Sequence, residues 1–149
     1  MIVTFCGHSS FTHSREHEEK IVNILNTKIG ENQVDFYLGG YGGFDTLAYA
    51  CCKKYQETHP NAKLIFVTPY ITEEYERNHL INYRDKYDEI IYPELEKIPL
   101  KFAIVYRNRW MVEKSDLVIC GISHSWGGAY KTYLHAKKKS KRIFNILDF

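Results

Sequence analysis

Short apolar runs alternate along the chain with longer stretches in which apolar residues recur at helical spacing. Five of these runs are predicted to be β-strands, at residues 2–5, 34–38, 62–70, 117–122 and 142–147. Strands that alternate with amphipathic helices favour a parallel sheet with helices on both faces. The sequence therefore predicts an α/β fold, a Rossmann-like three-layer sandwich with a mostly parallel sheet of about five strands.

Helices are predicted in the stretches between these strands. The first is closed by Gly30, and the last two lie at 102–116 and 127–140. Another follows directly on the second strand, and its inner side carries Leu47, Ala48, Cys51, Cys52 and Tyr55. Residues 72–99 are charged and rich in tyrosine, and their pattern indicates a helix only to about Tyr83.

Length and composition are typical of one globular domain over residues 1–149, with 44% hydrophobic and 26% charged residues. The net charge of +2 is too small to indicate nucleic-acid binding by itself. One basic cluster at 137–142 is interpreted as a solvated helix end. The four cysteines form no CxxC pair, and no signal peptide or membrane span is evident. We therefore expect a cytoplasmic protein with buried thiols and no membrane partner.

Four segments that follow predicted strands are rich in Gly, Ser, Thr and His, and they read CGHSS, GGYGG, TPY and ISHSWGG. In open α/β sheets, ligands bind beyond the carboxyl ends of the strands. Two of the segments contain glycine turns that lead into helices, formed by Gly39, Gly40, Gly42 and Gly43 and by Gly127 and Gly128.

Such turns let a ligand approach the main chain, and the start of the following helix favours an anion. A tight connection would explain either turn alone, but the two together favour phosphate binding. Neither turn matches the GxGxxG fingerprint or a Walker loop.

Several motifs together resemble those of the SLOG superfamily, Rossmann-like domains shared by the lonely-guy phosphoribohydrolases and the DNA-processing protein A family. The motifs are VTFCGH, LGGYGGFDTLAYA, RNRWMVEKSDLVIC and SWGGAYKTYLHAKKKSKRIFNI, in an order that matches over nearly the whole chain. Within the superfamily, the chain looks most like small stand-alone bacterial and phage proteins. The resemblance implies a nucleotide site along the glycine turn after the second strand.

The resemblance to the lonely-guy enzymes also extends to single positions. Arg107 and Met111 match the spacing of an arginine and a methionine on the helix before a strand in those enzymes. Their PGG-G-T-x-E-E signature, whose glutamate acts on an N-glycosidic bond, corresponds here to WGGAYKTY. Gly127 and Gly128 are kept, but Tyr133 stands where the first glutamate is expected. This departure argues against glutamate-dependent hydrolysis and leaves ligand binding intact.

Several side chains near the predicted strand ends are candidates for the ligand site. Arg107 and Arg109 offer a planar guanidinium to a phosphate, with a surface salt bridge as the alternative. His8 and His124 are able to donate to a phosphate, to act as acid or base, or to serve only structure. Asp45 is suited either to bond a ribose hydroxyl or to cap its helix.

Three further residues are included in the predicted ligand site: Gly7, Ser9 and Ser123. Tyr41 and Trp126 lie beside the glycine pairs, where an aromatic ring stacks on a base or covers the edge of the core. His13 and His17 have metal-ligand spacing but no third ligand, so no metal is expected. No cofactor is predicted.

These features support three functions, in decreasing order. The first is a sensor, carrier or sequestering module that binds a nucleotide or nucleotide-derived small molecule. The second is a hydrolase of a nucleotide's N-glycosidic bond that uses His8, Asp45 or His124 instead of the missing glutamate. A nucleic-acid-binding protein comes third. We also expect a homo-oligomer, because related domains pair through helices, and segment 72–99 is placed to cover a neighbour's site.

Overall fold

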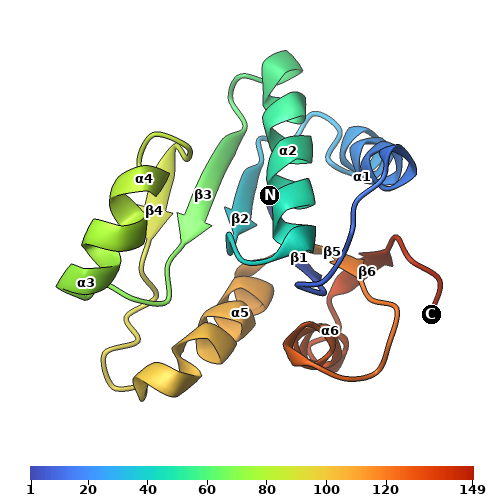
Figure 1. Ribbon diagram of the computed structural model, residues 1–149. Helices are drawn as coiled ribbons and strands as arrows, with labels where there is room; N and C mark the ends of the chain where they lie inside the picture. Colours follow the sequence, from blue (N-terminus) through green and yellow to red (C-terminus); the bar gives the residue numbers. More distant parts are fainter.

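The computed structural model describes all residues, 1–149, and its centre is a six-stranded sheet in the order β4-β3-β2-β1-β5-β6 (Figure 1). Every neighbouring pair of strands is parallel. The strands are β1 (Ile2–Gly7), β2 (Asp35–Leu38), β3 (Lys63–Val67), β4 (Glu89–Ile91), β5 (Leu117–Gly121) and β6 (Arg142–Asn145). The predicted Rossmann-like α/β class is confirmed.

Helices cover both faces of the sheet. The long ones are α1 (Arg15–Lys28), α2 (Gly43–Thr58), α5 (Ala103–Lys114) and α6 (Gly128–Lys138). Helices α1 and α2 pack together on one face, and α5 and α6 pack together on the other (Figure 1). None of the helices is long and apolar enough to span a bilayer.

The segment between β3 and β5 contains shorter elements. A helical stretch made of α3 (Glu73–Tyr75), the π-helical turn η1 (Glu76–Leu80) and α4 (Ile81–Tyr83) leads to β4, and the 3-10 turn η2 (Leu100–Phe102) leads into α5. The predicted end of the helix near Tyr83 therefore agrees with the structure.

Strand β4 corrects the predicted count of about five strands. It has three residues, all at least partly exposed, and it forms an edge of the sheet beside β3. Asp88 fixes its start, since Oδ2 of this residue accepts hydrogen bonds from the Leu64 main-chain N–H at 2.8 Å and from Gln56 Nε2 at 2.9 Å. A strand this short and exposed leaves no apolar run in the sequence.

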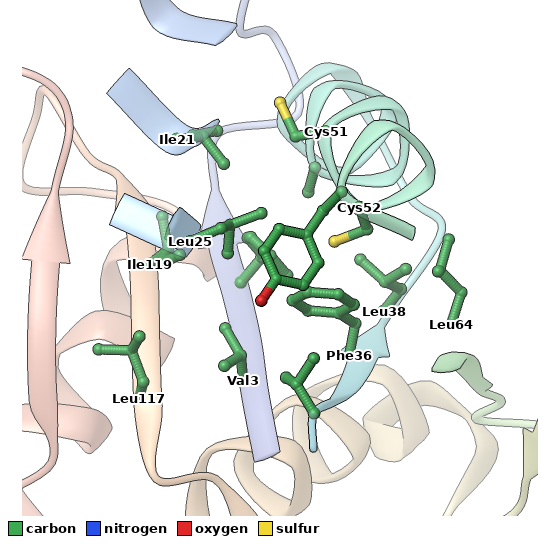
Figure 2. Packing of buried hydrophobic residues seen from close by; sticks show 14 of the residues in the cluster. Val3, Ile21, Leu25, Phe36, Leu38, Cys51, Cys52, Leu64, Leu117 and Ile119 are labelled. Carbon is green, nitrogen blue, oxygen red and sulfur yellow. The ribbon is translucent and has the colours of Figure 1, made fainter. Parts of the chain in front are cut away.

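The main core lies between the sheet and helices α1 and α2 (Figure 2). Val3 of β1 and Phe36 of β2 meet Ile21 and Leu25 of α1 there, and all four are completely buried. The predicted inner side of α2 is buried throughout, from Leu47 to Tyr55. All four cysteines are buried and free, as expected.

The strand order reverses at β1. The chain builds outward from β1 through β2 and β3 to β4, then returns to place β5 on the other side of β1, followed by β6. The segment after β1 leads to α1 on one face, whereas the segment after β5 leads to α6 on the opposite face. Diverging loops of this kind leave a crevice at the carboxyl end of the sheet, where open α/β proteins bind ligands.

Candidate functional site

A cleft of about 410 Å³ lies at this switch point. The segments after β1 and β5, helix α5 and the start of α6 line it, together with Tyr41 from the first glycine turn and Asp45 from the first turn of α2. The predicted site residues that line it are Gly7, His8, Ser9, Asp45, Arg107, His124, Gly127 and Gly128. Sequence positions far apart are thus brought to one place.

Arg107 enters the cleft from α5 and is only 2% exposed. Its Nη1 donates to the carbonyl oxygens of Val67 at 2.7 Å and Gly39 at 3.1 Å, and its Nε donates to Asn108 Oδ1 at 2.8 Å. The guanidinium forms no surface salt bridge, so that alternative is wrong for Arg107. Burial lowers the pKa of Arg107, but an arginine still carries its charge at neutral pH.

One end of this guanidinium is not used by the protein. Nη2 of Arg107 makes no hydrogen bond within the protein, and this atom is not fully buried. Because the residue lines the cleft, Nη2 offers a fixed, charged donor to whatever occupies it.

Asp45 is the only carboxylate that lines the cleft. Its Oδ2 accepts a hydrogen bond from the main-chain N–H of Tyr41 at 2.8 Å, which closes the first glycine turn. Burial raises the pKa of Asp45 to about 6, and this effect outweighs the opposing influence of the Tyr41 N–H and of Arg107. A carboxyl with such a pKa changes its charge close to neutrality.

The first glycine turn packs against the protein itself. A Cβ atom at Gly42 would lie 2.6 Å from Ser9 Cα, and one at Gly43 would overlap the carbonyl oxygen of Phe11. The Gly43 N–H already donates to the Ser9 carbonyl at 2.8 Å. Gly40, at a φ of +63°, lies against the ring of Phe66.

Gly39 completes this turn and occupies a narrow space between two charged groups. A Cβ at Gly39 would lie 3.2 Å from Arg107 Nη2 and 3.3 Å from Asp45 Oδ2. None of the four glycines lines the cleft, although all four were predicted to bind the ligand. The structure assigns them to contacts within the protein, because the loop after β1, Phe66 and the Arg107–Asp45 pair fill the space around them.

The second glycine turn is open. Nothing lies within 4 Å of a Cβ built at Gly127 or Gly128, and both residues line the cleft. Helix α6 starts here without a side-chain cap. The first N–H groups of a helix have no partner within it, so this terminus presents donors and a positive dipole end to the cleft.

Three aromatic rings form a column along one wall. His8 stacks on His124 with ring centroids 3.5 Å apart, and His124 stacks on Trp126 at 3.6 Å. His8 Nε2 accepts the Ser123 main-chain N–H at 3.1 Å, so its proton belongs on Nδ1. Burial, reinforced by His124, lowers the pKa of His8. Trp126 ends the column and is 68% exposed, while Tyr41 on the first turn is 64% exposed.

Besides the four glycines of the first turn, two predicted residues lie outside the cleft lining. Arg109 is exposed and packs on the ring of Tyr106, with 5.6 Å between its guanidinium carbon and the ring centroid. Ser123 contributes through the hydrogen bond of its main-chain N–H to His8. The sequence reasoning missed Ile104 and Thr132, which line the cleft. Ile104 precedes Arg107 by three residues, and Thr132 follows Gly128 by four. Residues at these spacings share one face of a helix, and this signal was available in the sequence.

The basic cluster at 137–142 lies at the far end of α6. Lys141 Nζ donates to the carbonyl oxygens of Glu113 at 2.9 Å and Ser115 at 3.0 Å, and Lys139 Nζ lies 3.8 Å from Glu113 Oε1. These lysines therefore join the ends of α5 and α6, in agreement with their interpretation as a helix end.

No protein-family model and no curated protein matches the chain. Among solved structures, DNA processing protein A from Helicobacter pylori superposes with a TM-score of 0.63 at 20% identity, over 97% of this chain and 64% of that one. DNA processing protein A from Streptococcus pneumoniae gives 0.64 at 20% identity, over 96% of this chain and 49% of that one. TM1055, a structural genomics target, gives 0.54 at 12% identity, over 95% and 71%.

The chain shares the fold of these three proteins. The chain spans roughly half to two thirds of the length of the two DNA processing proteins, with 49% and 64% covered. The Helicobacter pylori protein is described as having a unique single-stranded DNA binding mode. At these identities, the likeness establishes a common fold.

Proposed function

We propose that the cleft binds a nucleotide or nucleotide-derived small molecule, with its anionic group between Arg107 and the start of α6. The observation that carries this proposal is the buried guanidinium with an unused Nη2 in the cleft. Burial of a charge costs several kcal/mol, and the carbonyl oxygens around Nη1 and the nearby Asp45 carboxyl offset part of this cost. A bound anion would give Nη2 the hydrogen-bond partner that the protein does not supply.

The remaining parts of a nucleotide also find suitable surroundings. Trp126 exposes one ring face at the end of the aromatic column, and base stacking on an aromatic side chain is worth about 1–3 kcal/mol. Asp45 offers an acceptor for a ribose hydroxyl. The volume of about 410 Å³ falls within the range of small-molecule sites, about 300–1,000 Å³.

Binding of single-stranded nucleic acid is the second candidate. The likeness to a DNA processing protein with a single-stranded DNA binding mode and the exposed Trp126 and Tyr41 favour it. Charge speaks against it, because strand binding needs several cations and Arg107 is the only Lys or Arg in the cleft. The basic cluster lies about 16 Å away, at the rise of 1.5 Å per residue along α6.

Hydrolysis of an N-glycosidic bond remains the alternative if the ligand is turned over. Asp45 is then the only carboxyl in the cleft that is able to assist the leaving group or activate water.

A thermal-shift series tests these possibilities. Probes are nucleoside mono-, di- and triphosphates, NAD, ADP-ribose, cyclic dinucleotides, inorganic phosphate and an oligothymidylate, with chromatography of each mixture afterwards. A ligand at a hundred times its Kd stabilises by about 2.7 kcal/mol, which raises the Tm by about 5–10 °C in a chain of this size. We expect the shift with an intact nucleotide.

Variants locate the site. Gly128→Val adds a side chain in open space within the cleft, so it should fold and lose the shift. Arg107→Lys should weaken the shift, and Arg109→Ala on the same helix is the matched control that keeps it. Free base among the products would establish the hydrolase instead. A response to the oligothymidylate alone would favour strand binding, and no response to any probe would overturn the proposal.

A further inference from the structure

Two thiols face each other beneath the cleft. Cys6 of β1 and Cys120 of β5 are register partners on neighbouring parallel strands, and their Sγ atoms are 3.2 Å apart. Adjacent strands lie about 4.8 Å apart. This spacing falls within the Cα separations of about 4.4–6.8 Å that disulfides require. The pair is therefore placed to be bridged with little backbone movement.

The surroundings of the pair differ on its two sides. Both residues belong to the apolar cluster under α5 and α6, which includes Val112 and Ala136. Cys6 lines the cleft and is 6% exposed, whereas Cys120 is completely buried. Of the two residues, Cys6 is therefore the one that borders the cleft, from which a small reagent would approach.

We propose that Cys6 and Cys120 form an oxidation site for hydrogen peroxide that enters through the cleft, and that its product is a cross-strand disulfide. The Cys6 sulfur attacks one peroxide oxygen and becomes a sulfenic acid, with release of one water. The Cys120 sulfur then attacks the Cys6 sulfur and expels the second water. The two thiols lose two electrons and two protons in total, and the peroxide is reduced to two waters.

The thiol environment sets the rate of the first step. The hydrogen bond with Cys120 and burial both raise the pKa of Cys6, so little thiolate is present at neutral pH. The reaction should be slow and should accelerate as the pH rises. Once Cys6 is oxidised, the second step has its partner sulfur already in contact.

Coupling to the ligand rests on the proposed function. A molecule that fills the cleft covers Cys6, and it should therefore slow the oxidation. Disulfide formation in the free protein does not depend on that function, so the two ideas fail separately.

Peptide mapping tests the proposal. The protein is treated with hydrogen peroxide, its remaining thiols are blocked, and trypsin then releases Cys6 in peptide 1–15 and Cys120 in peptide 115–131. We expect these peptides to be joined, with loss of two hydrogen atoms. The internal control is peptide 29–53, which holds Cys51 and Cys52 on the other face of the sheet and should stay reduced.

Two comparisons make the result decisive. Cys120→Ala should leave Cys6 as a sulfenic or sulfinic acid, because no second thiol is within reach. In the wild-type protein, the joined peptides should form without urea, that is, in the folded state. This measurement does not depend on whether the Cys120→Ala variant folds. Separate peptides with Cys6 over-oxidised, or a bridge that forms only in urea, would overturn the proposal.

Discussion

Replacement of Asp45 by asparagine should stabilise the protein at alkaline pH. The raised pKa means that the folded state holds the Asp45 proton more tightly than the unfolded state does. Stability that this group contributes is therefore lost as the pH rises from about 4 through about 6. Asparagine carries no charge to desolvate, and its Oδ1 is able to keep the hydrogen bond from the Tyr41 N–H.

The shift gives the size of the effect. A change in the Asp45 pKa from 3.8 to about 6 is roughly two units. At 1.36 kcal/mol per unit, this corresponds to about 3 kcal/mol above pH 7. The value is an upper one, because Asp45 is only half-buried as a residue and lines the cleft, where water screens its charge. Near pH 4, where the folded-state carboxyl is protonated, the variant and the wild type should be almost equally stable.

Urea unfolding of both proteins at about pH 4 and about pH 8 measures this difference. The difference between variant and wild type at each pH isolates Asp45 from other titrating groups, His8 among them. Asp85→Asn, at an exposed position without an ion pair, is the matched control and should show no such trend. A less stable Asp45→Asn protein at pH 8, or a difference that does not change with pH, would refute the reasoning.

Four further outcomes are expected. Gly43→Ala should destabilise by about 1–3 kcal/mol in urea unfolding, because its Cβ meets the main chain after β1, whereas Gly128→Ala should be neutral or stabilising. Trp126→Ala should fold normally and weaken nucleotide affinity by about 10–100-fold in calorimetry. By NMR, the pKa of His8 should lie below the ordinary 6.5, since burial and the nearby His124 disfavour the charged ring. Light scattering should show an oligomer. Phe102 lies on an exposed apolar face, so Phe102→Glu should dissociate the oligomer, and a monomeric wild type would contradict this prediction.

Burial decides which strands the sequence reveals. Val3, Phe36, Leu64 and Leu117 lie in strands covered on both faces, and such strands appear as continuous apolar runs. At the edge of the sheet, β4 is held by pairing with β3 and by Asp88, and neither interaction leaves a local pattern. Tertiary contacts form this strand, so a single sequence does not predict it.

The site follows the same division. The topological rule and the loop composition predicted the place of the cleft, and the resemblance singled out Arg107. The partners of Arg107, the carbonyl oxygens of Gly39 and Val67, come from the ends of β2 and β3 and have no sequence signature. The contact of Cys6 with Cys120 likewise depends on strand register.

Glycine composition indicates a close approach to the main chain without saying what approaches. At Gly42 and Gly43 it is the protein's own loop after β1, and the Gly43 N–H already donates to the Ser9 carbonyl oxygen. At Gly127 and Gly128 the space is empty and belongs to the cleft. Two similar turns after parallel strands thus have different causes, and only the glycines of the second turn line the cleft.

The charges in the cleft narrow the kind of ligand that fits. Arg107 and the start of α6 attract an anion, but Asp45 in the same cleft repels one. Inorganic phosphate would satisfy the first pair and leave Asp45 Oδ1 without a donor, since the Tyr41 N–H bonds only Oδ2. A ligand that joins an anion to hydroxyl groups satisfies both, and a flat ring extending toward Trp126 adds stacking. The arrangement of one guanidinium, one carboxyl and one exposed indole therefore favours a nucleotide over a simple anion.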